Sequence, residues 1–150
     1  MKTLFIYYSF TGSGDLVAER MREKGAEVRK VQTKKAMPNS FFWSVMTGGF
    51  LASIGHKMPL IDYDKSLDGV DRVIIGSPVW NGRLSCPVNT LLSELKLNGV
   101  PVDFVLCSGG GTAPKAEQFL AKEYPASSVL VLKEPKKYPE ELDKLDGFFE

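Results

Sequence analysis

Short apolar runs and amphipathic stretches alternate along this chain of 150 residues. Segments rich in β-branched and aromatic residues are predicted to form five strands: Lys2–Tyr8, Ala26–Val31, Asp71–Ser77, Val102–Cys107 and Ser128–Leu132. The first, third and fourth are almost continuously apolar, as expected of central strands that are covered on both faces. The second alternates valines with charged residues, which suits the edge of a sheet.

Between these strands the apolar residues recur at helical spacing. The predicted helices are Asp15–Lys24, Val88–Leu97, Ala113–Tyr124 and Pro139–Phe149. Strands that alternate with helices of this length indicate a parallel sheet joined by right-handed crossovers. We therefore expect residues 1–150 to form a single α/β domain with a doubly wound, five-stranded parallel sheet.

Residues 38–57 depart from this alternation. They gather large apolar side chains, among them Phe41, Phe42 and Trp43, around Gly48–Gly49. A buried helix is the simplest interpretation of the segment. The alternative is a partly exposed patch that contacts a second copy or a partner, because each glycine weakens a helix by about 1 kcal/mol. A monomer or a weak homodimer is therefore expected.

Composition is that of an ordinary globular domain. With 25% charged residues and a formal net charge of +1, the sequence indicates neither nucleic acid nor a membrane as a partner, and no run has transmembrane length. Cys86 and Cys107 lack a C-x-x-C spacing, and His56 has no cluster of ligating residues around it, so no metal site is expected. Free thiols and the lack of a recognisable signal peptide favour a cytoplasmic protein.

The most informative segment follows the first predicted strand and reads Tyr-Ser-Phe-Thr-Gly-Ser-Gly-Asp. Hydroxyl groups at Ser9, Thr11 and Ser13 alternate along it, and Gly12 and Gly14 let backbone N–H groups approach an anion. The helix that follows adds the positive end of its dipole. No lysine or arginine lies between residues 2 and 20, so the loop itself offers only neutral donors. The pattern predicts a site for a phosphate monoester.

Other phosphate-binding loops fit this segment less well. A P-loop would end in Gly-Lys-Ser/Thr, which is absent here. A dinucleotide-binding fingerprint would need a third glycine where Val17 stands, and the second predicted strand ends without the acidic residue that binds a ribose. Taken alone, the loop is also compatible with an ordinary Gly/Ser turn between a strand and a helix.

Two more unusual loops follow predicted central strands, where ligands of parallel sheets bind. Residues 76–83 read Gly-Ser-Pro-Val-Trp-Asn-Gly-Arg, and residues 107–112 read Cys-Ser-Gly-Gly-Gly-Thr. Together with the phosphate loop, and in the same order along the chain, they resemble the flavodoxin family over essentially the whole sequence. The departure is Gly14, where the family usually carries threonine, so the resemblance implies one hydroxyl contact fewer to a phosphate.

The resemblance implies an FMN site and the sheet order 2-1-3-4-5. It implies that Trp80 packs on the isoalloxazine ring, that the glycine loop after the fourth strand meets its pyrimidine edge, and that the Asn81–Gly82 peptide reorients beside the flavin. A core tryptophan and a simple Asn-Gly turn are the alternative interpretations. No catalytic residue is implied, because the cofactor carries the chemistry. The implied cofactor-binding residues are Ser9, Thr11, Gly12, Ser13, Gly14, Ser77, Pro78, Val79, Trp80, Asn81, Gly82, Cys107, Ser108, Gly109, Gly110 and Gly111.

The function implied is that of a flavodoxin that carries single electrons between a reductase and an acceptor enzyme, its redox partner proteins. The alternative is a small FMN-dependent NAD(P)H:quinone or flavin reductase, because the near-neutral charge differs from the acidic surfaces of well-known flavodoxins and Ser108–Pro114 contains no aromatic residue. A flavin-free anion-binding module is a third possibility. Loops 77–85 and 107–115 contain Arg83 and Lys115 but no acid, so the fully reduced, anionic flavin is expected to be penalised less than in acidic flavodoxins.

Overall fold

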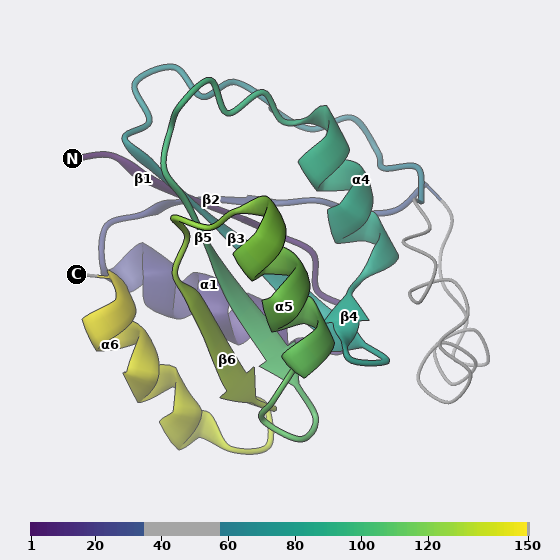
Figure 1. The fold of residues 1–150 in the computed structure, drawn as a ribbon. Helices are drawn as coiled ribbons and strands as arrows, with labels where there is room; N and C mark the ends of the chain where they lie inside the picture. Colours follow the sequence, from purple (N-terminus) through teal and green to yellow (C-terminus); the bar gives the residue numbers. More distant parts are fainter. Residues whose placement is uncertain (35–57, 150) are drawn as a thin grey trace.

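The computed structural model describes residues 1–34 and 58–149 (Figure 1). The prediction made for residues 38–57 lies outside the described residues. In chain order the elements are β1 (Thr3–Tyr7), α1 (Ser13–Glu23), β2 (Glu27–Lys30), β3 (Arg72–Trp80), β4 (Arg83–Leu84), α4 (Cys86–Glu94), β5 (Val102–Ser108), α5 (Pro114–Glu123), β6 (Val129–Lys133), the 3-10 helix η1 (Pro139–Asp143) and α6 (Lys144–Phe149).

The sheet has the predicted topology. Its strands lie in the order β2-β1-β3-β5-β6, all neighbours are parallel, and the short β4 pairs antiparallel with the end of β3. When the parallel strands are numbered along the chain, this is the order 2-1-3-4-5. The doubly wound, flavodoxin-like α/β fold is therefore confirmed.

Both faces of the sheet are covered by helices (Figure 1). Along β1, Leu4 and Ile6 pack into a core shared with α4 and α5, whereas Phe5 and Tyr7 pack into a second core shared with α1 and α6. Successive side chains of a strand point to opposite faces, so a continuous apolar run supplies both cores. The edge strand β2 is only partly buried, as its alternating sequence predicts.

The end of β3 differs from the prediction. The strand continues to Trp80, because Pro78 pairs with Cys107 of β5 and Trp80 pairs with Arg83 of β4. Asn81 and Gly82 join β3 to β4 with φ angles of 51° and 76°, the positive values that a two-residue hairpin of type I′ requires. The segment expected as an open loop is a strand end followed by a tight hairpin.

Helix boundaries also differ from those predicted. Helix α4 ends at Glu94, because Leu95 takes an extended conformation with ψ of 129°. The helix predicted over Pro139–Phe149 is divided into the tighter η1 and the α-helical α6. In the described part of the chain, no helix has the length and apolar character needed to cross a membrane.

Candidate functional site

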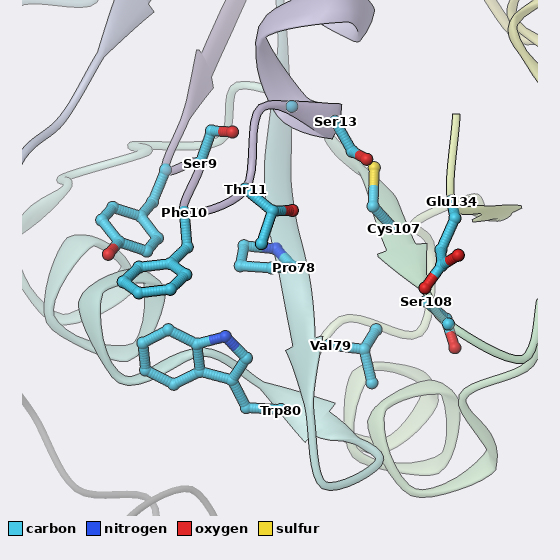
Figure 2. Close-up of a pocket in the computed structure, with 13 residues that line it drawn as sticks. Ser9, Phe10, Thr11, Ser13, Pro78, Val79, Trp80, Cys107, Ser108 and Glu134 are labelled. Atoms are coloured by element: carbon cyan, nitrogen blue, oxygen red, sulfur yellow. The ribbon is translucent and has the colours of Figure 1, made fainter. Parts of the chain in front are cut away.

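A cleft of about 560 Å³, part of it open to solvent, lies at the carboxyl ends of β1, β3, β5 and β6 (Figure 2). It is lined by residues of the β1–α1 loop, by Pro78–Trp80 of β3, by Cys107–Gly109 at the end of β5 and by Glu134 after β6. Parallel strands place their carboxyl ends at one edge of the sheet, which is why segments distant in sequence meet here.

Most of the predicted cofactor-binding residues line this cleft: Ser9, Thr11, Ser13, Gly14, Pro78, Val79, Trp80, Cys107, Ser108 and Gly109. The others do not line it: Gly12, Ser77, Asn81, Gly82, Gly110 and Gly111. Three lining residues were not predicted, namely Tyr8, Phe10 and Glu134. The first two alternate with the predicted hydroxyl residues, and the third follows the last parallel strand, so the rule of strand ends could have found all three.

The N-terminus of α1 lies at the wall of the cleft. Its N-cap is Gly12, in the left-handed conformation with φ of 100°, and no side chain in the described part of the chain caps it. The first N–H groups of a helix have no intrahelical partner and carry partial positive charge. Ser13 and Gly14 line the cleft in this turn, so their N–H groups are placed to bind an anion.

The loop before α1 is closed tightly on itself. The N–H of Gly12 donates to Oγ of Ser9 over 3.2 Å. A Cβ atom added at Gly14 would lie 2.9 Å from Cβ of Ser9 and 3.2 Å from Cδ2 of Tyr7, closer than side chains pack. A side chain at position 14 would therefore require Ser9 or Tyr7 to shift.

Trp80, Phe10 and Tyr8 form an aromatic wall. The ring centroid of Trp80 lies 6.4 Å from that of Phe10 and 6.0 Å from that of Tyr8, both in edge-to-face contact. Only 1% of Trp80 is exposed, and its side chain belongs to the core beneath α4 and α5. The structure thus supports the core interpretation of Trp80, although the residue also lines the cleft.

The indole nitrogen of Trp80 has an unusual position. Nε1 is buried and has no hydrogen-bond partner among the described residues. In Figure 2 it lies on the edge of the ring that faces Thr11 and Pro78. A buried donor without an acceptor costs about 1–3 kcal/mol. An acceptor atom of a bound ligand would relieve that cost.

Ser77 and the Asn81–Gly82 turn support the site from outside the cleft. Ser77 is buried, its hydroxyl donates to the carbonyl oxygen of Pro78 over 2.8 Å, and it accepts from the N–H of Ser85 over 3.1 Å. The carbonyl oxygen of Gly82 accepts from the N–H of Ala116 over 2.9 Å, which anchors the hairpin on α5. At the opposite wall, the hydroxyl of Ser108 donates to the carbonyl oxygen of Thr112 over 2.8 Å and closes the glycine loop.

Glu134 is an acid of the cleft that the sequence did not predict. The sequence placed Arg83 and Lys115 around the site without an acid, but neither lines the cleft: Lys115 packs on Gly82, 3.6 Å from an added Cβ there, and Arg83 is partly buried. Glu134 lines the cleft instead, held by its N–H, which donates to the carbonyl oxygen of Ser108 over 3.1 Å. An acid therefore lines the cleft although the two predicted loops contain none, because β6 lies beside β5 and brings a residue that is distant in sequence to the same edge of the sheet.

The other titratable groups of the cleft are neutral. Burial raises the pKa of Tyr8 to about 12 and that of Cys107 to about 12, so both keep their protons near pH 7. Cys86 and Cys107 are free thiols. Within residues 1–34 and 58–149, no three histidine, cysteine or acidic side chains gather as a metal site would require.

The sequence matches no family model and no curated protein. A "putative flavoprotein" from Bacteroides eggerthii is similar in structure, with a TM-score of 0.74 and 21% identity over 95% of this chain and 96% of that chain. Another "putative flavoprotein", from Bacteroides uniformis, gives a TM-score of 0.68 and 23% identity over 91% and 94%. A flavoprotein in complex with FMN from Lactobacillus acidophilus gives 0.61 and 21% over 93% and 97%. These likenesses show that the chain shares the fold of these proteins.

Proposed function

We propose that this protein binds FMN in the cleft and carries electrons one at a time between a reductase and an acceptor protein. One observation carries the proposal: an uncapped helix N-terminus and an aromatic wall with an unpaired N–H donor meet in a single cleft. The helix N-terminus suits a phosphate, and the aromatic wall suits a flat heteroaromatic ring. The flavoprotein from Lactobacillus acidophilus, which shares the fold, was crystallised with FMN.

The cleft residues divide into groups that match the parts of this cofactor. Thr11, Ser13 and Gly14 would hold the phosphate with hydroxyl and backbone donors. Trp80 would face the cofactor with its unpaired indole N–H, and the loop after Ser108 would offer backbone N–H groups to the polar edge of the flavin. FMN supplies the electron transfer when bound, while the protein binds it, orients it and excludes water from it.

The carrier role is supported by the small number of acid–base groups that line the cleft. Tyr8 and Cys107 stay protonated near pH 7, so of the titratable residues that line the cleft only Glu134 is available as an acid or base for a substrate. The proposal includes a reductase and an electron acceptor as redox partner proteins. It also includes a cytoplasmic location, where the two free thiols would persist, and a monomer or weak homodimer.

A second candidate is an FMN-dependent reductase of quinones or flavins that uses NAD(P)H. It is favoured by the loop after β5, in which Ser108–Pro114 supplies no aromatic side chain to cover the outer face of a flavin. An uncovered ring would admit a small acceptor molecule. FMN-loaded protein mixed with NAD(P)H and a quinone separates the candidates: turnover without an added reductase supports the second one, and turnover only with a separate reductase supports the carrier.

Cofactor binding is tested by fluorescence titration of the apo-protein with FMN, riboflavin and FAD. FMN should bind tightest, because it alone presents a terminal phosphate monoester to the loop. Thr11→Val keeps the shape of the side chain but removes its hydroxyl, and it should weaken FMN binding by about 1.5–3 kcal/mol while leaving riboflavin unaffected. Thr112→Val, at an exposed position outside the cleft, is the matched control. Equal affinity of the wild type for FMN and riboflavin would overturn the proposal.

A further inference from the structure

The segment between β6 and η1 places a cation over the phosphate loop. The ammonium group of Lys136 donates to the carbonyl oxygen of Thr11 over 3.1 Å, although the two residues are 125 positions apart in the chain. The backbone N–H of Lys136 donates to Oγ of Ser13 over 3.4 Å. Its side chain also covers Gly12, where an added Cβ would lie 3.8 Å from both Cδ and Nζ of the lysine. One residue thus holds the loop at three successive positions.

This contact changes the chemistry of the loop. Between residues 2 and 20 the sequence has no lysine or arginine, so the loop's own donors are all neutral. Lys136 adds a positive charge whose contact in the described structure is a neutral carbonyl oxygen rather than a carboxylate. The charge is therefore not offset by an ion pair among the described residues, and it lies against the outer side of the loop, since Lys136 contacts Thr11 and Ser13 but is not among the residues that line the cleft.

The two acidic residues near the loop, Asp15 and Glu134, are held by other residues. The carboxylate of Asp15, in the first turn of α1, forms an ion pair of 3.0 Å with Lys30 and accepts a hydrogen bond of 2.7 Å from Tyr7. Glu134 lines the cleft and is joined through its backbone to Ser108, on the β5 side. The phosphate loop therefore has a cation of its own in Lys136, while Asp15 in the first turn of α1 is already paired.

Two other groups of the same cleft are placed to donate hydrogen bonds to a ligand: the indole nitrogen of Trp80 and the first turn of α1. Nε1 of Trp80 is buried without a partner among the described residues, and the first turn of α1 has no side-chain cap. Neutral donors such as these bind an uncharged oxygen as well as a charged one, whereas an ammonium group distinguishes a dianion from a hydroxyl. Among the donors near the loop, the ammonium group of Lys136 is thus the one whose interaction with the ligand depends most on the ligand's charge.

We infer that Lys136 is the residue by which this protein selects a phosphorylated flavin over an unphosphorylated one. It acts on the phosphate through its charge, and it holds Thr11 and Ser13 in the closed loop. The inference rests on the proposed function, because it concerns the phosphate group of FMN.

The test compares the apo-proteins of Lys136→Gln, Lys136→Arg and Lys137→Gln by calorimetric titration with FMN and riboflavin. Lys137 is the matched control: it has the same charge at the next position, but its ammonium lies 5.6 Å from the ring centroid of Tyr138. Lys136→Gln should weaken FMN binding about five- to tenfold at low salt and leave riboflavin unchanged. Lys136→Arg should bind nearly as the wild type does, and Lys137→Gln should match it. High salt should reduce the effect of Lys136→Gln, because it screens an exposed charge.

A second readout needs no flavin. Inorganic phosphate should raise the melting temperature of the wild-type apo-protein and of Lys137→Gln, and raise that of Lys136→Gln less. If FMN binds the wild type and Lys136→Gln behaves as Lys137→Gln does, the inference is overturned while the proposed function stands. Equal weakening of FMN and riboflavin in Lys136→Gln would also overturn it, since that would mark a merely structural role. If the wild type binds neither flavin, the proposed function fails, and the inference with it.

Discussion

The hydroxyl of Tyr7 donates a hydrogen bond of 2.7 Å to the carboxylate of Asp15, which joins the last residue of β1 to the first turn of α1. The residues between them form the loop that lines the cleft. Lys30, at the end of β2, adds an ion pair of 3.0 Å to the same carboxylate. Both ends of the candidate phosphate loop are therefore held together by groups that lie outside it.

This arrangement predicts a pH dependence of stability. Although partial burial opposes the effect, the Tyr7 hydroxyl and the Lys30 ammonium lower the pKa of Asp15 below its ordinary value of 3.8. A carboxyl group with a lowered folded pKa stabilises the fold above its unfolded pKa, and this contribution is lost as the pH falls through the folded pKa. Asp15→Asn should be less stable than the wild type at pH 7, and the difference should shrink below about pH 4.

Urea unfolding at a series of pH values measures this difference. Asp68→Asn, at an exposed position, is the control and should change the free energy of unfolding by less than about 0.5 kcal/mol at pH 7. A difference between Asp15→Asn and the wild type that stays constant down to pH 3 would contradict the assignment.

Because Trp80 is buried, two substitutions there can distinguish its structural role from a role in binding FMN. Trp80→Ala should lower the free energy of unfolding by about 3–5 kcal/mol, because it leaves a cavity in the core. Trp80→Phe keeps most of the packing but removes the unpaired Nε1–H, so it should weaken FMN binding more than it weakens the fold. Denaturant unfolding and FMN titration measure the two effects. Phe119→Ala, at a residue that is 43% exposed, is the control. If Trp80→Phe binds FMN as tightly as the wild type does, a contact from the indole nitrogen is excluded.

The crowding at Gly14 predicts that the threonine usual at this position in flavodoxins would be harmful here. Gly14→Thr would drive a Cβ to 2.9 Å from Cβ of Ser9, so the loop must open and both stability and FMN affinity should fall, stability by about 1–3 kcal/mol. Gly110→Ala is the matched control, because an added Cβ there meets nothing within 4 Å. Thermal unfolding and FMN titration of both variants test this. An FMN affinity of Gly14→Thr above that of the wild type would show that the missing hydroxyl matters more than the packing.

Glu134 should influence the midpoint potential of bound FMN. A carboxylate at the wall of the cleft repels a reduced, anionic flavin, so Glu134→Gln should raise the potential, on the order of 40 mV for about 1 kcal/mol of repulsion. Arg83→Gln and Lys115→Gln should have smaller effects, since these residues do not line the cleft. Spectroelectrochemical titration at low salt measures the shifts, with Glu117→Gln on α5 as the control. Larger shifts in Arg83→Gln and Lys115→Gln than in Glu134→Gln would show that these two cations influence the flavin potential more than Glu134 does, as the sequence predicted.

Local sequence determined the helices and strands and the position of the anion-binding loop. The continuous apolar run of β1 predicts burial on both faces, and the Gly/Ser segment after it predicts the anion-binding loop, because strand periodicity and glycine geometry act over a few neighbouring residues. The strand order and most of the cleft-lining residues followed from the resemblance of three such loops to those of a known family. Those predictions required no contact between distant residues to be known beforehand.

The remaining features were decided by tertiary structure. Trp80 is a buried residue because β3 continues alongside β5 and then turns back at Asn81–Gly82, a pairing that no local pattern in β3 encodes. Glu134 and Lys136 reach the site because β6 packs in parallel beside β5, which carries the chain after it to the same edge as the β1–α1 loop. Charge acts through space rather than along the chain, so the electrostatics of the cleft could be known only once these segments were placed beside one another.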